Sequence, residues 1–146
     1  MTDFPHIYTT NAQGTIDPIL KLTSDGLPEL QVSPPTNFGG PEGYWNPEAF
    51  FSASVSTCFI LTFKSVARAM KLEWIDINVD ADAYLDKQDS KLSFTKIDIF
   101  VTLRVPVGSS HDNYHKALIK AEASCLITNS IKSDIHLHPV IQDLSK

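Results

Sequence analysis

The two cysteines of this 146-residue chain, Cys58 and Cys125, are the side chains best suited to covalent chemistry. A cysteine thiolate is a nucleophile that can be oxidised reversibly, so two of them can form and break a disulfide. The first residues, from Met1 to His6, contain neither a basic segment nor the apolar run of a secretion signal. We therefore expect a reducing, cytoplasmic environment, where a pair of cysteines is more often reactive than structural.

Each candidate residue also has a structural interpretation. Cys58 could be a small apolar residue in a helix core, and the same holds for Cys125. A third candidate, Glu48, lies in the first turn of a predicted helix, where an acid interacts favourably with the helix dipole without any catalytic role. From residue type and position alone, both interpretations stay open for all three residues.

Histidines raise the question of a metal site. His111 and His115 are four residues apart at the start of a predicted helix, a spacing that can place two imidazoles on one ion. No further ligand at a suitable spacing accompanies them, so we interpret both as surface residues. A metal site made of Cys58, Cys125 and a histidine is possible, but nothing in the sequence supports it. We expect no metal and no organic cofactor.

The segment from Asn46 to Met70 must position Cys58. It begins with an N-cap residue, a proline whose φ is already helical, and an acid. Tyr44 and Trp45, just before the cap, could wall an apolar pocket or staple the start of this helix, and we expect the staple. Residues 49–63 carry no charge, and the helix is apolar or small on every side, so we predict that it is buried all round. Positive side chains follow at its far end, at Lys64, Arg68 and Lys71.

Covering such a helix needs more than one chain. At about 1.5 Å per residue the helix is somewhat under 40 Å long, more than one sheet face and one short helix can cover. A second copy of the same helix, packed antiparallel across a two-fold axis, would cover the remaining side. We therefore predict an obligate homodimer with an interface larger than roughly 2,000 Å² in total.

The rest of the chain predicts an α+β fold with an antiparallel sheet. Apolar residues alternate with polar ones from Ile75 to Leu85 and again from Leu92 to Val107, which indicates a long antiparallel hairpin. A second helix is predicted over residues 112–124, with four apolar residues on one face: Tyr114, Ala117, Leu118 and Ala121. A further helical piece at residues 129–132 and a last strand from Ile135 to Ile141 complete the fold.

The N-terminal part is predicted to be a β-meander. Its expected strands cover residues 7–10, 19–23 and 30–33, and the expected turns cover residues 11–14 and 24–26. Composition and spacing show no linker or repeat, so we predict one domain over residues 1–146. Its three parts are the meander and loop (1–45), the central helix (46–71), and the hairpin, second helix and last strand (72–146).

Composition limits the possible partners. The hydrophobic content of 42% and the charged content of 20% are ordinary for a globular protein. A formal net charge of −5 without a basic stripe argues against nucleic-acid binding. The apolar run around Cys58 is short and rich in serine and threonine, so we expect no membrane span.

Two sets of residues carry a resemblance to a known family. The first is Asn46-Pro47-Glu48, followed after nine residues by Cys58-Phe59. The second lies in the C-terminal half and comprises Tyr84-Leu85-Asp86-Lys87, Thr95-Lys96-Ile97, Pro106, and Lys120-Ala121 leading to Cys125. From about Gly40 to Gln142 the chain resembles the OsmC/Ohr family of cysteine peroxidases. The resemblance implies an intertwined α+β homodimer with two central helices.

The resemblance also implies a mechanism. Cys58 would be the thiolate that attacks a hydroperoxide and becomes a sulfenic acid, and Cys125 would resolve it into a disulfide. An external dithiol would then reduce that disulfide. Glu48 matches a carboxylate that holds a catalytic arginine beside the thiolate.

The chain departs from this family at the arginine. Only Arg68 and Arg104 exist in the sequence, and neither lies in the N-terminal meander or the glycine-rich loop, where the family supplies it. Arg68 is about 15 Å from Cys58 along the helix, Arg104 is expected to face solvent, and Lys21 is the remaining cation that could reach the site. Without a cation, burial should keep the pKa of Cys58 at or above the free value of roughly 8.5, and peroxide reduction should accelerate as pH rises.

Two functions follow. The first is a thiol-dependent peroxidase that acts on organic hydroperoxides, because the expected pocket is apolar, lined by Tyr44, Trp45, Phe50 and Phe51. The second is a non-catalytic OsmC-like dimer that binds a small apolar or electrophilic ligand. The retained Glu48, Cys58 and Cys125 favour the peroxidase, and the missing arginine favours the binding protein.

Overall fold

The computed structural model describes residues 3–144, which divide into two compact units. The first unit ends at Phe50 and the second begins at Phe51. Among the described residues, every buried side chain except those of Val32 and Ser33 belongs to the second unit. The single-domain assignment of residues 1–146 stays a prediction.

The first unit is built on a small antiparallel sheet in the order β1-β2-β3. Its strands are β1 (Asn11–Gln13), β2 (Leu20–Thr23) and β3 (Leu30–Val32), and a 3-10 turn, η1 (Thr36–Phe38), follows. The strands predicted at residues 19–23 and 30–33 are therefore confirmed.

The predicted strand at residues 7–10 is wrong, as is the turn predicted at 11–14. Residues 7–10 have no strand conformation, whereas residues 11–13 pair with β2 as strand β1. Ile7 and Tyr8 have high strand propensity, yet their side chains are 83% and 89% exposed. Strand propensity describes how well a side chain fits a paired, half-buried surface, and this segment offers none.

The central helix, α1 (Pro47–Ala69), begins and ends as its sequence indicates. The Asn46 Oδ1 accepts a hydrogen bond from the Ala49 N–H at 2.8 Å, which caps the first turn. Trp45 stacks on Phe50 with ring centroids 5.5 Å apart, so the predicted staple is confirmed. At the other end Lys71 takes a positive φ of 55°, and the two backbone bonds of a Schellman motif close the helix.

One chain covers only one face of α1, as expected for a helix that one sheet face and one short helix cannot cover, and burial of the other side by a second copy stays a prediction. The opposite side exposes Thr57, Leu61 and Lys64, and the Leu61 side chain is 62% exposed. The buried residues form a stripe at helical spacing: Val55, Phe59, Phe63, Val66 and Ala67.

By length and composition alone, α1 is apolar enough to cross a membrane, with a mean hydropathy of 1.4 over an 18-residue window. The core helix of a soluble protein meets the same criterion. Since Val55, Phe59 and Phe63 belong to the hydrophobic core of the second unit, we interpret α1 as a core helix.

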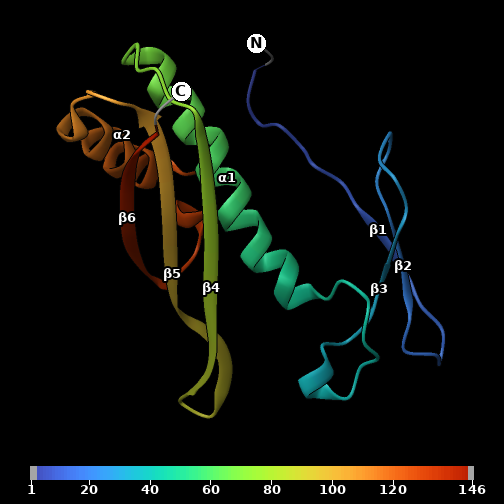
Figure 1. Cartoon of the computed structure of the whole chain (residues 1–146). Coiled ribbons are helices and arrows are strands. Elements are labelled where there is room, and N and C mark those ends of the chain that lie inside the picture. The colour runs from blue at the N-terminus through green and yellow to red at the C-terminus, as the bar shows by residue number, and fades with distance from the viewer. Residues whose placement is uncertain (1–2, 145–146) are drawn as a thin grey trace. The chain divides into compact units, whose positions relative to one another are not determined.

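The second unit contains a three-stranded sheet in the order β4-β5-β6, with α1 alongside it (Figure 1). β4 (Asp76–Gln88) and β5 (Lys91–Pro106) form the predicted antiparallel hairpin. Its turn is tight, because Asp89 and Ser90 both adopt positive φ values and connect the strands in two residues.

The last strand, β6 (Asp134–Leu144), pairs with β5 in parallel, so the sheet is mixed and not antiparallel throughout. The crossover between these strands contains α2 (His111–Ser124) and the short 3-10 turn η2 (Thr128–Ser130). The second helix and its buried face, Tyr114, Ala117, Leu118 and Ala121, are as predicted.

The core lies between the helices and one face of the sheet. Alternate residues of β5 fill it, namely Ile97, Ile99, Val101, Leu103 and Val105. Burying each such side chain contributes roughly 1.5–3 kcal/mol. The α+β fold class is confirmed, and this core fixes α1 and α2, the elements that carry the two cysteines or end beside them.

Candidate active site

Cys58 lies near the middle of α1, at the margin of its buried stripe, and its side chain is half-buried. The hydroxyl oxygen of Thr62, one helical turn later, is 3.8 Å from the Cys58 Sγ. The Cys125 side chain and the backbone of Leu126 and Ile127 also hydrogen-bond to the thiol. Both helices therefore contribute to one site inside the second unit.

Cys125 is fully buried at the C-terminal end of α2, in an extended conformation that stops the helix. Its carbonyl oxygen accepts hydrogen bonds from the Asn129 N–H at 3.0 Å and from the Thr128 hydroxyl at 3.2 Å. These bonds hold the turn that directs the backbone of residues 126 and 127 toward Cys58. The structure thus brings the two predicted cysteines together as free thiols.

The expectation of a raised pKa for Cys58 is wrong. Burial does raise the pKa of the thiol, but hydrogen bonds from the backbone of Ile127 and from Cys125 lower it. Weaker contributions from Thr62 and the backbone of Leu126 act in the same direction. The net effect holds the pKa of Cys58 below its usual value, because donors that hydrogen-bond a thiolate favour the charged form.

No arginine or lysine takes part in this effect among the described residues that act on Cys58. Lys21 pairs with Glu29 within the N-terminal sheet, with Nζ 3.3 Å from the carboxylate. Arg104 forms a two-pronged ion pair with Asp76 across the hairpin, and this pair lowers the pKa of the Asp76 carboxyl. Arg68 is exposed near the end of α1.

Glu48 lies apart from the cysteines. Cys58 comes ten positions after it on α1, about 15 Å along the helix axis. Its Oε1 atom is buried and has no hydrogen-bond partner among the described residues. Together with Asn37 and Tyr44 it lines an open cavity of about 430 Å³ within the first unit. The structure therefore brings Cys58 and Cys125 together without showing a contact to Glu48, and the role of Glu48 stays a prediction.

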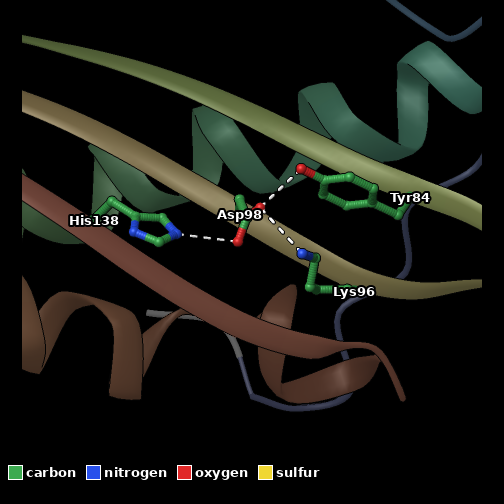
Figure 2. Close-up of polar contacts among 4 residues, drawn as sticks. All are labelled: Tyr84, Lys96, Asp98 and His138. Atoms are coloured by element: carbon green, nitrogen blue, oxygen red, sulfur yellow. Dashed lines mark hydrogen bonds and ion pairs between the residues drawn. The ribbon is translucent and has the colours of Figure 1, made fainter.

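A second polar cluster occupies the sheet face opposite the core. Tyr84, Lys96 and His138 point toward Asp98 from the three strands β4, β5 and β6 (Figure 2). The Tyr84 hydroxyl donates to Asp98 over 2.9 Å, His138 Nε2 lies 3.0 Å away, and Lys96 Nζ lies 3.5 Å away. Hydrogen bonds from His138 and Tyr84 lower the pKa of Asp98. Each member is already paired, so we assign the cluster to the sheet and not to ligand binding.

The described residues contain no group of three histidine, cysteine, aspartate or glutamate side chains able to hold a metal ion. His111 is exposed and lies 2.9 Å from Asp143, and His115 is exposed on α2. Sequence reasoning missed the backbone donors at Leu126 and Ile127, because a peptide N–H leaves no residue signature. A threonine four residues after a helical cysteine was the one signal that could have pointed to Thr62.

Comparisons with known proteins confirm the family resemblance. A sequence model of the family described as OsmC-like protein matches residues 39–139. Peroxiredoxin OsmC of Escherichia coli (strain K12) is 29% identical over 102 residues, which are 70% of each chain. The structure of an OsmC-like protein of unknown function from Vibrio cholerae matches with a TM-score of 0.86 and 18% identity, over 93% of this chain and 100% of that one. An organic hydroperoxide resistance protein OsmC from Legionella pneumophila matches with a TM-score of 0.72 and 21% identity, over 96% and 99% of the respective chains. The chain therefore belongs to the OsmC-like protein family.

Proposed function

We propose that this protein is a thiol-dependent peroxidase that reduces organic hydroperoxides, with Cys58 as the attacking thiolate. The observation that carries the proposal is a Cys58 thiol with a lowered pKa hydrogen-bonded to a second cysteine, Cys125. A lowered pKa increases the fraction of thiolate at a given pH, a thiolate can attack a peroxide, and a neighbouring thiol can form a disulfide with the product. Membership of a family that includes a named peroxiredoxin supports the same reaction.

The Cys58 thiolate attacks the terminal oxygen of R–O–OH, the O–O bond breaks, and Cys58 becomes a sulfenic acid while the alkoxide leaves and takes a proton to give the alcohol. The Cys125 thiol then attacks the sulfenic acid, forming a Cys58–Cys125 disulfide and releasing water. An external dithiol reduces the disulfide and is itself oxidised to a disulfide.

An organic rather than an inorganic peroxide fits the side chains beside the thiols. Leu126, directly after Cys125, exposes about two-thirds of its side chain. This exposed surface favours a substrate with an alkyl or aryl group, because contact between apolar surfaces removes both from water. We propose that the protein works in the cytoplasm, where a dithiol reductant keeps both cysteines reduced.

We also propose that the protein is a homodimer. One chain leaves a whole side of α1 exposed, and the first unit buries little beyond Val32. A second copy packed against α1 would cover this surface. Light scattering at micromolar concentration should give the dimer mass, and Leu61→Glu should shift it toward the monomer by placing a charge in the interface. A monomeric wild type would exclude this assembly.

A different function is favoured by one observation. Glu48 presents an unpartnered carboxylate oxygen beside a cavity of about 430 Å³ in the first unit. Thr36 and Asn37, which line that cavity, lie near the place where the family supplies its arginine. A protein that binds a small electrophilic ligand without turnover would retain such a space. This alternative predicts ligand binding in the absence of hydroperoxide consumption.

Stopped-flow mixing of the reduced protein with an alkyl hydroperoxide distinguishes these functions. We expect stoichiometric loss of the Cys58 thiol, appearance of a Cys58–Cys125 disulfide by peptide mapping, and no reaction in Cys58→Ser. Cys125→Ser should still consume one equivalent but should accumulate the sulfenic acid. Wild-type protein that reacts no faster than free cysteine would reject the peroxidase in favour of the binding function.

A further inference from the structure

Thr62 differs from the other hydroxyl side chains of α1 in what it contacts. Four of those side chains donate to a carbonyl oxygen of the preceding turn, namely Ser54, Ser56, Thr57 and Ser65. Ser52 donates to the Ala81 carbonyl of β4. Thr62 instead places its hydroxyl 3.8 Å from the Cys58 Sγ. Back-bonding to the helix is the usual choice for a helical threonine, so its absence here requires a reason.

The surroundings of Cys58 supply that reason. Among the described contacts that act on the thiol, the donors are neutral: the hydroxyl of Thr62, the backbone of Leu126 and Ile127, and the Cys125 side chain. Cys125 is the one titratable group among them. A thiolate formed in this position would depend on hydrogen bonds alone, and each donor that is lost would leave part of the negative charge unsatisfied.

We propose that Thr62 is a positioning residue, whose hydroxyl donates to the Cys58 thiolate and, with the peptide groups of Leu126 and Ile127, replaces the arginine that the chain lacks. This role rests on the proposed function of Cys58 and adds to it the groups that stabilise the Cys58 thiolate. The Thr62 hydroxyl can serve both protonation states, since it accepts from the thiol and, after rotation, donates to the thiolate.

Three variants test this role. Thr62→Val removes the hydroxyl at nearly constant shape, Thr62→Ser retains it, and Thr57→Val is the matched control. Thr57 lies next to Cys58 on the exposed side of α1, and its hydroxyl donates to the Ala53 carbonyl at 2.7 Å. Thiolate absorbance at 240 nm is followed against pH in each variant, with the Cys58→Ser protein subtracted, and the rate of iodoacetamide alkylation is measured at pH 7.

We expect Thr62→Val to raise the apparent pKa of Cys58 by about one unit, which is a tenfold loss of thiolate below that pKa. Thr62→Ser should restore the wild-type titration, and Thr57→Val should not change it. A Thr62→Val protein that titrates like the wild type would overturn the role of Thr62. So would an equal shift in Thr57→Val, since both would then report only a perturbed helix.

Ionic strength tests the neutral character of the donors. The apparent pKa should stay nearly constant between 0.05 and 1 M NaCl, whereas a thiolate held by an exposed cation would lose stabilisation as salt screens the pair. A large rise of the pKa with salt would show that a cation from a second copy acts on Cys58. Titration and alkylation need no peroxide, so a wild type without peroxidase activity would reject the proposed function and leave the Thr62 result interpretable.

Discussion

The two units of this chain differ in how they obtain stability. In the second unit, α1, α2 and β5 bury a continuous apolar core around residues such as Phe63 and Leu103. Among the described residues of the first unit, only Val32 and Ser33 are buried, while large apolar side chains such as Ile7 and Ile16 are exposed. The second unit can therefore hold Cys58 and Cys125 in place by its own packing. The first unit leaves apolar surface exposed in the single chain, and the proposed second copy is one surface that could cover it.

The strongest test of this difference is a large-to-small substitution in the second unit. Phe63 is fully buried and packs edge-on against Trp74, with ring centroids 5.4 Å apart. Phe63→Ala should destabilise the protein by about 3–5 kcal/mol, since it removes buried apolar area and leaves a cavity. Urea unfolding followed by far-ultraviolet circular dichroism measures the loss. A change under about 1 kcal/mol would show that the unit is not organised around this core.

The matched substitution in the first unit is Ile7→Ala. A side chain that is 83% exposed in the chain should change stability by less than about 0.5 kcal/mol if it stays in water. If a second copy covers it, the loss should be larger at high protein concentration and should disappear on dilution to the monomer. The two variants measured at two concentrations therefore separate packing within one chain from packing between copies.

The start of α1 lies next to the boundary between the units in the sequence, and removing its cap should lower the free energy of unfolding by a smaller amount than Phe63→Ala. Asn46→Ala removes the oxygen that accepts from the Ala49 N–H and should cost about 1 kcal/mol. Asn46→Asp retains an acceptor and is the control. Equal destabilisation by both variants would show that the cap contributes nothing beyond the side-chain change.

The Asp98 cluster predicts a pH dependence confined to the second unit. The folded-state pKa of Asp98 is lowered, so the unfolded chain binds a proton more readily and the cluster stabilises the fold above a pH of about 4. That stability is lost as the pH falls below this value through the folded pKa. The difference in urea midpoint between the wild type and Asp98→Asn should therefore be greatest near pH 6 and should vanish in acid. A constant difference would contradict the linkage.

The smallest expected effect concerns His111 and Asp143, which pair at 2.9 Å between α2 and β6. Both side chains are more than two-fifths exposed, so His111→Ala should change stability by less than about 0.5 kcal/mol. His115→Ala, on the same helix, is the control. Thermal unfolding at pH 6 and pH 8 checks both variants, and a large loss at either pH would assign this pair a structural role.

Local sequence signals predicted the central helix and the hairpin because each is specified by its own residues. Asn46 and Trp45 mark the start of α1 through cap and staple, and alternation of apolar residues marks the hairpin. The direction of β6 could not be predicted in the same way. A period of two is identical for parallel and antiparallel strands, and the pairing with β5 depends on the crossover through α2.

The candidate site was also predicted only in part from the sequence. Residue type and spacing identified Cys58 and Cys125, but the pKa of Cys58 depends on where the turn after α2 places the backbone of Ile127. The strand predicted at Ile7 and Tyr8 is wrong although both residues have high strand propensity, because their exposed side chains have no paired surface in the chain. Sequence reasoning succeeded where one element determines the outcome and failed where two elements must meet.

Pro139, in the middle of the edge strand β6, has a consequence for how the protein behaves at high concentration. A strand at a sheet edge offers unpaired N–H and C=O groups to any other extended chain, and long regular edges promote aggregation. Pro139 lies opposite Val101 and has no N–H, and a proline within a sheet is confined to an edge strand with its N–H side toward solvent. A strand added along β6 would therefore find no donor at Pro139, which disfavours regular edge-to-edge pairing.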